Sequence, residues 1–259
     1  MINHDNTNTD EHMRREFNEW AQAGRGEEME NHHISITQQT LALMKLQSGQ
    51  RVLDLGCGAG WASRLLAQMV GGGDRPGPGS PGRPVSAEWG GGQVVGLDVS
   101  DEMIRRARAT STGFDNILFV VGSAQQIPWQ EGFFDKVLSV ESFYYYGDQG
   151  GALDEVFRVM APGGELYILI NLYKDNHYSL RWVEELNVPV QVKSEQEYMA
   201  LFAKHGFENV RAERIPDLTP TPEEYSGKWF KNAAELTDFK RIGALLLIGK
   251  KPGAEPQRH

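Results

Sequence analysis

The stretch VLDLGCGAG at residues 52–60 decides the fold of this chain. A short apolar run is followed at once by Gly56, Gly58 and Gly60, and a segment of helical period comes next. Glycines at this spacing let the backbone turn tightly and approach a ligand, while the following helix offers the free N–H groups of its first turn. In open parallel sheets such loops lie in the crevice beyond the carboxyl ends of the strands. The stretch therefore predicts a nucleotide site built from a strand, a loop and a helix.

Short apolar runs like this one recur along the chain and alternate with segments of helical period. The alternation predicts a parallel sheet covered by helices on both faces, and so an α/β layered fold. Runs that are apolar throughout indicate strands buried on both sides. We expect strands at 51–55, 94–97, 117–121, 136–140, 165–171, 210–213 and 244–248.

Two of the expected helices carry clear end signals. The helical stripe at 153, 156, 157 and 160 stops at the sequence PGG of 162–164, and Ser194 with Glu197 forms a capping box for a helix that stops near Gly206. We expect a single domain over 1–259. Its parts are a disordered tail at 1–10, a helical cap at 11–50, a flexible Gly/Pro-rich insertion at 71–92 and an insertion between the last two strands at 214–240.

The composition narrows the classes of partner. The 259 residues carry a formal net charge of -9, which gives no general attraction to a phosphate backbone, so nucleic acid is not an expected partner. No apolar run approaches the roughly 20 residues that cross a membrane, and the polar N-terminus is not that of a secretory signal. Cys57 is the only cysteine, which excludes an intrachain disulfide and fits a reducing cytoplasm. The oligomeric state stays open.

Polar residues at three strand ends indicate the kind of ligand. Asp54 lies just before the glycines, where a carboxylate can hold a cationic ammonium group directly or through water and would repel a pyrophosphate. Asp98 ends the second strand in VVGLDVS, where it can accept hydrogen bonds from two ribose hydroxyls. It could instead cap the next helix, although Ser100 is better placed for that. Beyond the third strand, residues 122–124 can meet the edge of an adenine whose face Met103 covers.

Five motifs follow one another in order between residues 51 and 213: VLDLGCGAG, VVGLDVS, GSAQQIPW, FFDKVLSVES and EVFRVMAPGGELYI. Together they resemble the class I S-adenosylmethionine-dependent methyltransferases, in particular the branch of the ubiquinone and menaquinone biosynthesis methyltransferases. The resemblance implies a Rossmann-like, doubly wound sheet of seven mostly parallel strands with the last strand antiparallel, and an N-terminal helical cap. It also implies S-adenosylmethionine as the methyl donor and S-adenosylhomocysteine as the product.

The same resemblance assigns contacts to the cofactor. It implies that Asp54 and the three glycines surround the methionine moiety, that Asp98 binds ribose, and that 123–124 meets adenine. Relatives often carry an aspartate where Ser123 stands, so the hydrogen bond to the adenine amino group is expected to be weaker or made differently here. The expected cofactor-binding residues are Asp54, Gly56, Cys57, Gly58, Gly60, Asp98, Val99, Met103, Gly122, Ser123, Ala124 and Val140.

The stretch SVESFYYYGD at 139–148 marks the side of the site that receives the methyl group. Methyl transfer is an in-line displacement that depends on alignment and water exclusion, and a base helps only a nucleophile that carries a proton. Glu141 is the candidate base or substrate anchor, although a carboxylate there can also contact the cofactor or cap a helix. The tyrosines that follow can wall an apolar pocket, contact a cation, donate hydrogen bonds, or only pack under a loop.

The expected residues on this side come from three parts of the chain. The N-terminal cap contributes Phe17, Trp20, His32 and His33, and a segment after the fifth strand contributes Asn171 and Tyr173. We expect Glu141 and Tyr145 to be catalytic, and Tyr144, Tyr146, Asn171, Tyr173 and Trp20 to bind the substrate.

The adjacent His32 and His33 also suggest a metal or a proton relay. We disfavour the metal, because neighbouring residues point in different directions and no ligand set completes them, and Cys57 is interpreted as a packing residue of the loop. The favoured function is methyl transfer from S-adenosylmethionine to a small-molecule acceptor. Methylation of a protein or RNA, a nicotinamide dinucleotide-binding oxidoreductase with the same glycine pattern, and a non-catalytic S-adenosylmethionine-binding module are the alternatives.

Overall fold

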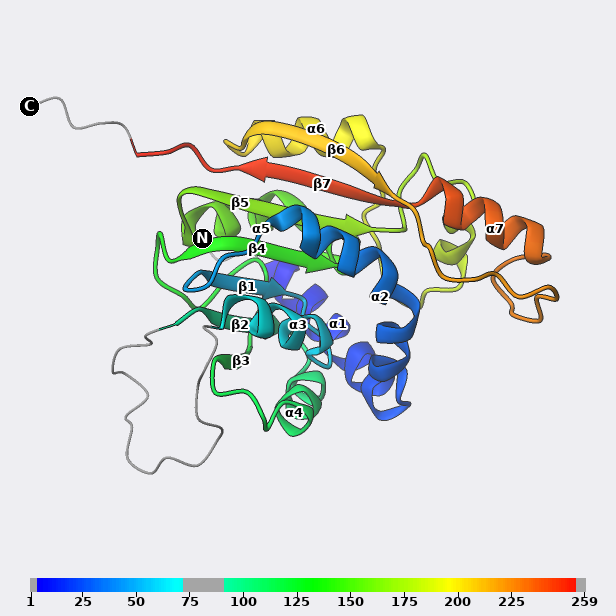
Figure 1. Cartoon of the computed structure of the whole chain (residues 1–259), viewed down its shortest axis with the longest axis horizontal. Coiled ribbons are helices and arrows are strands. Elements are labelled where there is room, and N and C mark those ends of the chain that lie inside the picture. The colour runs from blue at the N-terminus through cyan, green and yellow to red at the C-terminus, as the bar shows by residue number, and fades with distance from the viewer. Residues whose placement is uncertain (1–3, 72–90, 255–259) are drawn as a thin grey trace, which may run out of the picture.

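The computed structural model describes residues 4–71 and 91–254, which form a central sheet with helices on both faces (Figure 1). The sheet has seven strands in the order β3-β2-β1-β4-β5-β7-β6. Strand β7 runs antiparallel to β5 and β6, and the other pairs are parallel. The predicted doubly wound sheet with an antiparallel last strand is confirmed. The strands are β1 Arg51–Leu55, β2 Gln93–Asp98, β3 Ile117–Val121, β4 Phe134–Val140, β5 Met160–Ile170, β6 Glu208–Ile215 and β7 Ala244–Lys250.

Helices cover both faces because alternate side chains of the central strands are apolar on both sides. Val52 and Val94 pack in one cluster with residues of α2 and α3, whereas Leu53 and Val95 pack in another with residues of α5 and α6. Within the described ranges no helix is long and apolar enough to cross a membrane. The helices are α1 His4–Gln22, α2 Arg25–Met44, α3 Trp61–Val70, α4 Asp101–Thr110, α5 Gln149–Val159, α6 Glu195–Lys204 and α7 Ala233–Ile242, with the short 3-10 helices η1 Phe143–Tyr145 and η2 Ser179–Glu184.

The position of the site follows from the strand order. The chain passes from β1 through β2 to β3 at one edge of the sheet, then returns to the other side of β1 to form β4. The strand order therefore reverses between β1 and β4, and ligands of open α/β sheets bind beyond the carboxyl ends of strands at such a reversal. The glycine loop after β1 and the segment after β4 meet there.

Predictions at helix ends are largely confirmed. Ser100 caps α4, since its hydroxyl accepts the Met103 N–H at 3.0 Å. Ser194 and Glu197 form the predicted capping box at the start of α6. Helix α5 ends at Val159, earlier than predicted, because the chain enters β5 directly at Met160, which pairs with Phe134.

The chain differs from expectation at its N-terminus. A disordered tail was expected over 1–10, but α1 already begins at His4, because the polar residues continue the helix whose buried face contains Met13. Residues 72–90 lie outside the described ranges, and with them almost all of the expected flexible insertion. The segment 214–240 contains the start of α7, whose Phe239 packs on Trp182 of η2 with ring centroids 5.5 Å apart.

Candidate active site

The glycine loop is held by backbone hydrogen bonds to β2 and by close packing at two of its glycines. The N–H groups of Gly56 and Cys57 both donate to the Leu97 carbonyl of β2, at 2.7 and 3.0 Å. Gly56 has φ 75°, and a Cβ at this position would lie 2.4 Å from the Ser142 hydroxyl oxygen. Gly60 has φ 78°, and a Cβ there would lie 2.7 Å from the Phe119 ring. Any larger residue at either position would therefore displace the loop.

Asp98 joins the loop to the end of β2. Its Oδ2 accepts the Gly58 N–H at 2.9 Å, and its Oδ1 accepts the Ser100 N–H at 2.9 Å. Burial raises the pKa of this carboxyl, while the two backbone hydrogen bonds favour its charged form. Each carboxylate oxygen can accept more than one hydrogen bond, so Asp98 can also receive two hydroxyl donors from the pocket.

Asp54 lies beneath the loop and does not line the pocket. Its side chain is 1% exposed and accepts the Ser63 hydroxyl of α3 at 2.6 Å. Burial raises the pKa of Asp54 to about 7, against the lowering effect of that hydrogen bond. Contact with an ammonium group through water stays a prediction. Gly60 likewise lies outside the pocket wall.

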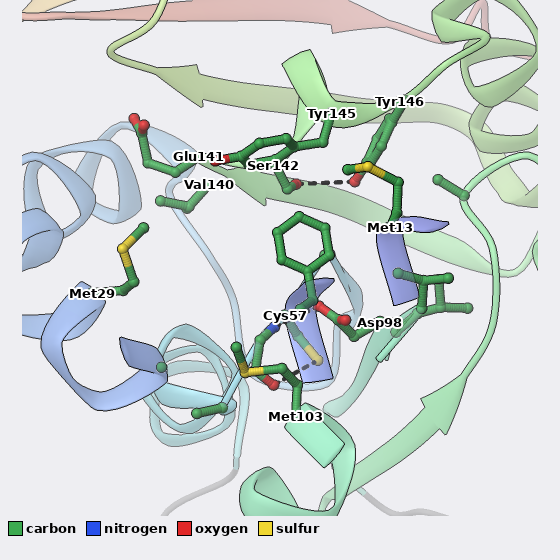
Figure 2. Close-up of a pocket in the computed structure, with 18 of the residues that line it drawn as sticks. Met13, Met29, Cys57, Asp98, Met103, Val140, Glu141, Ser142, Tyr145 and Tyr146 are labelled. Atoms are coloured by element: carbon green, nitrogen blue, oxygen red, sulfur yellow. Dashed lines mark hydrogen bonds between the residues drawn. The ribbon is translucent and has the colours of Figure 1, made fainter. Parts of the chain in front are cut away.

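One pocket collects most of the predicted residues and has a volume of about 1020 Å³, open mouth included. Figure 2 shows Cys57, Asp98 and Met103 together at one side, with Tyr145 and Tyr146 opposite them. The predicted residues that line the pocket are Gly56, Cys57, Gly58, Asp98, Val99, Met103, Gly122, Ser123, Ala124, Val140, Glu141, Tyr145, Tyr146 and Trp20.

The wall from the N-terminal cap is larger than predicted. Phe17 packs edge-to-face on Trp20 and Tyr145, with ring centroids 5.2 and 5.0 Å apart. The residues that reach the pocket recur at intervals of three and four, the period of a helix face, and that pattern was available in the sequence. From α1 they are Asp10, Met13, Phe17 and Trp20, and from α2 they are Gly26, Met29 and His33.

Glu141 has the most unusual environment in the pocket. It has φ 53°, a conformation that residues other than glycine rarely adopt and that is often found at functional sites. Its Oε1 accepts both the backbone N–H and the side-chain amide of Asn171, at 2.7 and 3.0 Å, and its Oε2 accepts the Tyr144 hydroxyl at 3.0 Å. Burial raises the pKa of Glu141 to about 7, although these three hydrogen bonds lower it.

Three residues expected to bind substrate lie outside the pocket wall. Tyr144 and Asn171 hold the Glu141 carboxylate from behind, as their hydrogen bonds show. Tyr173 is fully buried and donates to the Gly243 carbonyl at 2.9 Å, so it belongs to the core. Tyr146 does line the pocket, and its hydroxyl lies 2.9 Å from the Ser142 hydroxyl and donates to the Leu55 carbonyl at 3.3 Å.

Two chemistries find little support in the described parts of the chain. These parts hold no group of three or more His, Cys, Asp or Glu side chains that could bind a metal ion. Burial raises the pKa of the Cys57 thiol well above its usual range, and the nearby Asp54 and Asp98 carboxylates add to the effect. The thiol is therefore protonated and is a poor nucleophile.

Residues 46–212, which run from just before β1 into β6, match the family model described as a methyltransferase domain. The chain belongs to this methyltransferase family. Its family is that of the class I enzymes whose methyl donor is S-adenosylmethionine, as the motifs implied. Gly56, where a Cβ would meet the Ser142 side chain, and the Asp98 carboxylate suit the methionine and ribose parts of that cofactor.

Known methyltransferases resemble this one to different extents. It is 28% identical to the sterol 24-C-methyltransferase of Pneumocystis carinii over 220 residues, which are 79% of this chain and 52% of that protein. It is 29% identical to the demethylmenaquinone methyltransferase of Listeria monocytogenes over 136 residues, or 52% of this chain and 50% of that protein. The methyltransferase thus spans about half the length of these curated relatives.

A solved structure matches over nearly the whole chain. It is that of a complex between the Haloferax volcanii Trm112 methyltransferase activator and a methyltransferase, with 30% identity and a TM-score of 0.79. The match covers 92% of this chain and 98% of the other.

A buried carbonyl oxygen without a partner lies in the pocket beside Ser123. Gln125 lines the pocket next to Ser123, and its Oε1 is buried without a hydrogen-bond partner. Its amide nitrogen donates to Asp10 of α1 at 3.4 Å, and its backbone N–H donates to the Ser123 hydroxyl oxygen at 3.1 Å. An unpaired buried carbonyl oxygen favours an N–H donor. We expect Gln125 to make the contact that an aspartate at position 123 makes in relatives.

This expectation can be tested with a cofactor analogue. The methyltransferase should bind S-adenosylhomocysteine about tenfold more tightly than S-inosylhomocysteine, whose carbonyl replaces the amino group, and Gln125→Leu should remove most of the difference. Isothermal titration calorimetry gives both affinities. Gln126→Leu is the matched control, since Gln126 is exposed and does not line the pocket. A Gln125→Leu enzyme that keeps the full preference would contradict the assignment.

Proposed function

We propose that this methyltransferase transfers the methyl group of S-adenosylmethionine to a small, largely apolar molecule inside the pocket between the glycine loop and helices α1 and α2. The observation that carries the proposal is the wall formed by Phe17, Trp20 and Tyr145 beside the cofactor residues. Aromatic side chains packed edge to face in this way suit an apolar acceptor of limited size. The sterol and quinone acceptors named for the two curated relatives agree with it.

The residues of the chain have separate tasks in this reaction. S-adenosylmethionine, when bound, supplies a methyl group on a cationic sulfur. Asp98 and the glycine loop hold the cofactor, while the aromatic wall excludes water and offers ring faces to positive charge. Glu141 is the proposed proton acceptor, and Tyr145 orients the acceptor molecule against the reacting methyl group. Tyr144 and Asn171 keep the Glu141 carboxylate in place.

A substrate panel tests the proposal. The enzyme is incubated with S-adenosylmethionine and demethylmenaquinol, a sterol, simple phenols, bulk tRNA or a mixture of proteins, and formation of S-adenosylhomocysteine is measured. We expect turnover with a small acceptor and a loss of at least about tenfold in Trp20→Ala, because the wall aligns the acceptor. Turnover with only tRNA or protein would overturn the small-molecule assignment.

We also propose that the chain associates with a methyltransferase activator of the Trm112 kind. The support is the match to the methyltransferase complex with Haloferax volcanii Trm112, which extends over 92% of this chain. Co-expression with that activator and size-exclusion chromatography test the association, and the panel is repeated with the complex. Separate elution of the two proteins, with no change in turnover, would argue against this partner.

A further inference from the structure

Two buried groups face each other at the pocket wall with no hydrogen-bond donor between them. His33 of α2 has its Nδ1 2.9 Å from the Met29 carbonyl, which can only accept, so Nδ1 carries the ring proton. A neutral imidazole has one N–H, and Nε2 is therefore an acceptor. Burial lowers the pKa of His33 to about 4, which keeps the ring neutral at pH 7.

The partner of His33 is also an acceptor. The Oε2 of Glu141 lies 4.0 Å from His33 Nε2, a distance too long for a hydrogen bond. The other contacts of the Glu141 carboxylate are three donors, two from Asn171 and one from Tyr144, and each of them favours the charged form. One donor is thus missing from the space between the two side chains.

This space is open to the pocket. The side chains of His33 and Glu141 keep 11% and 4% of their surface exposed, and both residues line the pocket. Figure 2 shows Glu141 beside Val140 and on the same side of the pocket as Met29, one helical turn before His33. Because the two facing atoms both accept hydrogen bonds and no donor lies between them, a ligand that brings an O–H or N–H group to this space gains affinity.

We propose that His33 and Glu141 together bind the hydroxyl of the methyl acceptor, so that the substrates of this enzyme are neutral apolar molecules with an O–H group. The proposal rests on the proposed function and names the substrate class of the same pocket. Met13, Met29 and the aromatic wall supply apolar contacts for the rest of such a molecule.

The pair also defines the path of the proton. The acceptor oxygen gains the methyl group from the sulfonium, the electron pair of the broken S–C bond stays on sulfur as a neutral thioether, and the hydroxyl proton passes to Glu141 Oε2. Other titratable groups around the pair are His32 on α2, Tyr144 and Tyr145 on η1, and Asp217 after β6.

Matched probes test the proposal on the enzyme loaded with S-adenosylhomocysteine. 4-Nitrophenol carries the hydroxyl, 4-nitroanisole has the same ring without it, and 4-nitrobenzylamine carries a cation. We expect 4-nitrophenol to bind about tenfold more tightly than 4-nitroanisole, the value of one well-made hydrogen bond to a charged group. The yellow anion of the bound phenol gives a second readout. Because both partners accept a hydrogen bond and one of them is a carboxylate, the anion should form at higher pH on the enzyme than in buffer.

Variants test whether the preference for the phenol depends on His33 and Glu141. His33→Phe and Glu141→Gln should each reduce the preference for the phenol to about threefold or less, and Glu141→Gln should also abolish the shift in phenol ionisation. Glu141→Gln keeps the size of the side chain, so it separates loss of the site from loss of folding. His205→Phe is the control, since His205 pairs with Asp154 at 2.6 Å and does not line the pocket.

The possible results decide between the readings. Equal or absent binding of the phenol and the anisole, or a preference that survives both variants, would overturn the hydroxyl site. Tighter binding of the amine would replace it with a site for cations. The proposed function is tested separately: calorimetry of S-adenosylhomocysteine tests the cofactor site before any probe is added, and the substrate panel tests methyl transfer to a small acceptor.

Discussion

Replacing Asp98 with alanine is expected to weaken S-adenosylhomocysteine binding at least about a hundredfold. Hydrogen bonds to a charged group contribute about 1.5–3 kcal/mol each, and two ribose hydroxyls would lose such a partner. The same change leaves the N–H groups of Gly58 and Ser100 without their acceptor, so the loop loses part of its support. Isothermal titration calorimetry measures the affinity, and thermal unfolding shows whether the fold survives.

Two further variants separate the cofactor contact from the support of the loop. Asp98→Asn keeps one oxygen for the backbone donors but loses the charge, and it should bind with intermediate affinity. Asp135→Ala is the matched control, because Asp135 pairs with Arg51 and does not line the pocket. Binding by Asp98→Ala within about threefold of the parent enzyme would show that ribose is held elsewhere.

The second large effect that we expect is a change in how the free energy of unfolding depends on pH in the Glu141→Gln variant. The folded state raises the pKa of Glu141 to about 7 from the usual 4.5, mainly through burial. A raised pKa contributes stability that is complete below the unfolded pKa and is lost as the pH rises through the folded one. Between pH 4.5 and pH 8 the parent enzyme should therefore lose roughly 3 kcal/mol of unfolding free energy that the glutamine variant keeps.

Urea unfolding at several pH values measures this difference. Glu197→Gln serves as a control of opposite sign, because a hydrogen bond from Lys174 lowers the pKa of Glu197 to about 2. Its contribution is complete above pH 4.5 and is lost progressively as the pH falls from there to about 2, so this variant should be the less stable one at neutral pH. Parallel pH curves for Glu141→Gln and the parent enzyme would contradict the buried, proton-binding state of Glu141.

The cofactor side of the pocket could be predicted from the sequence, because each of its segments is marked by a short local pattern. The glycine loop, Asp98 and residues 122–124 each follow a short apolar run, and the parallel sheet brings the ends of those runs together. The pocket contacts of the cap formed by α1 and α2 could not be predicted in this way, because they depend on how these two helices pack against the rest of the fold. The helical period of their pocket-facing residues is visible in the sequence, but the sequence does not show which part of the protein that face contacts.

The direction in which a side chain points also limited the predictions for single residues. Asp54 is in β1, where alternate side chains face opposite sides of the sheet, so it points with Val52 toward α3 and Ser63. Tyr144, Tyr145 and Tyr146 are consecutive in or next to a 3-10 turn, and such neighbours diverge: two reach the pocket, and Tyr144 turns back to Glu141. A cluster of like residues therefore did not imply one shared role.

The contact between Gly56 and Ser142 has a consequence for how this enzyme can change over evolution. A side chain at position 56 would collide with the Ser142 hydroxyl and reach the Tyr146 hydroxyl. A larger residue in the glycine loop therefore requires a compensating substitution in the segment after β4. We therefore expect the effects of substitutions at these two positions to depend on each other. We expect changes of acceptor specificity to arise mainly through substitutions in α1 and α2. Side chains there can be replaced singly without altering the residues that bind the methyl donor.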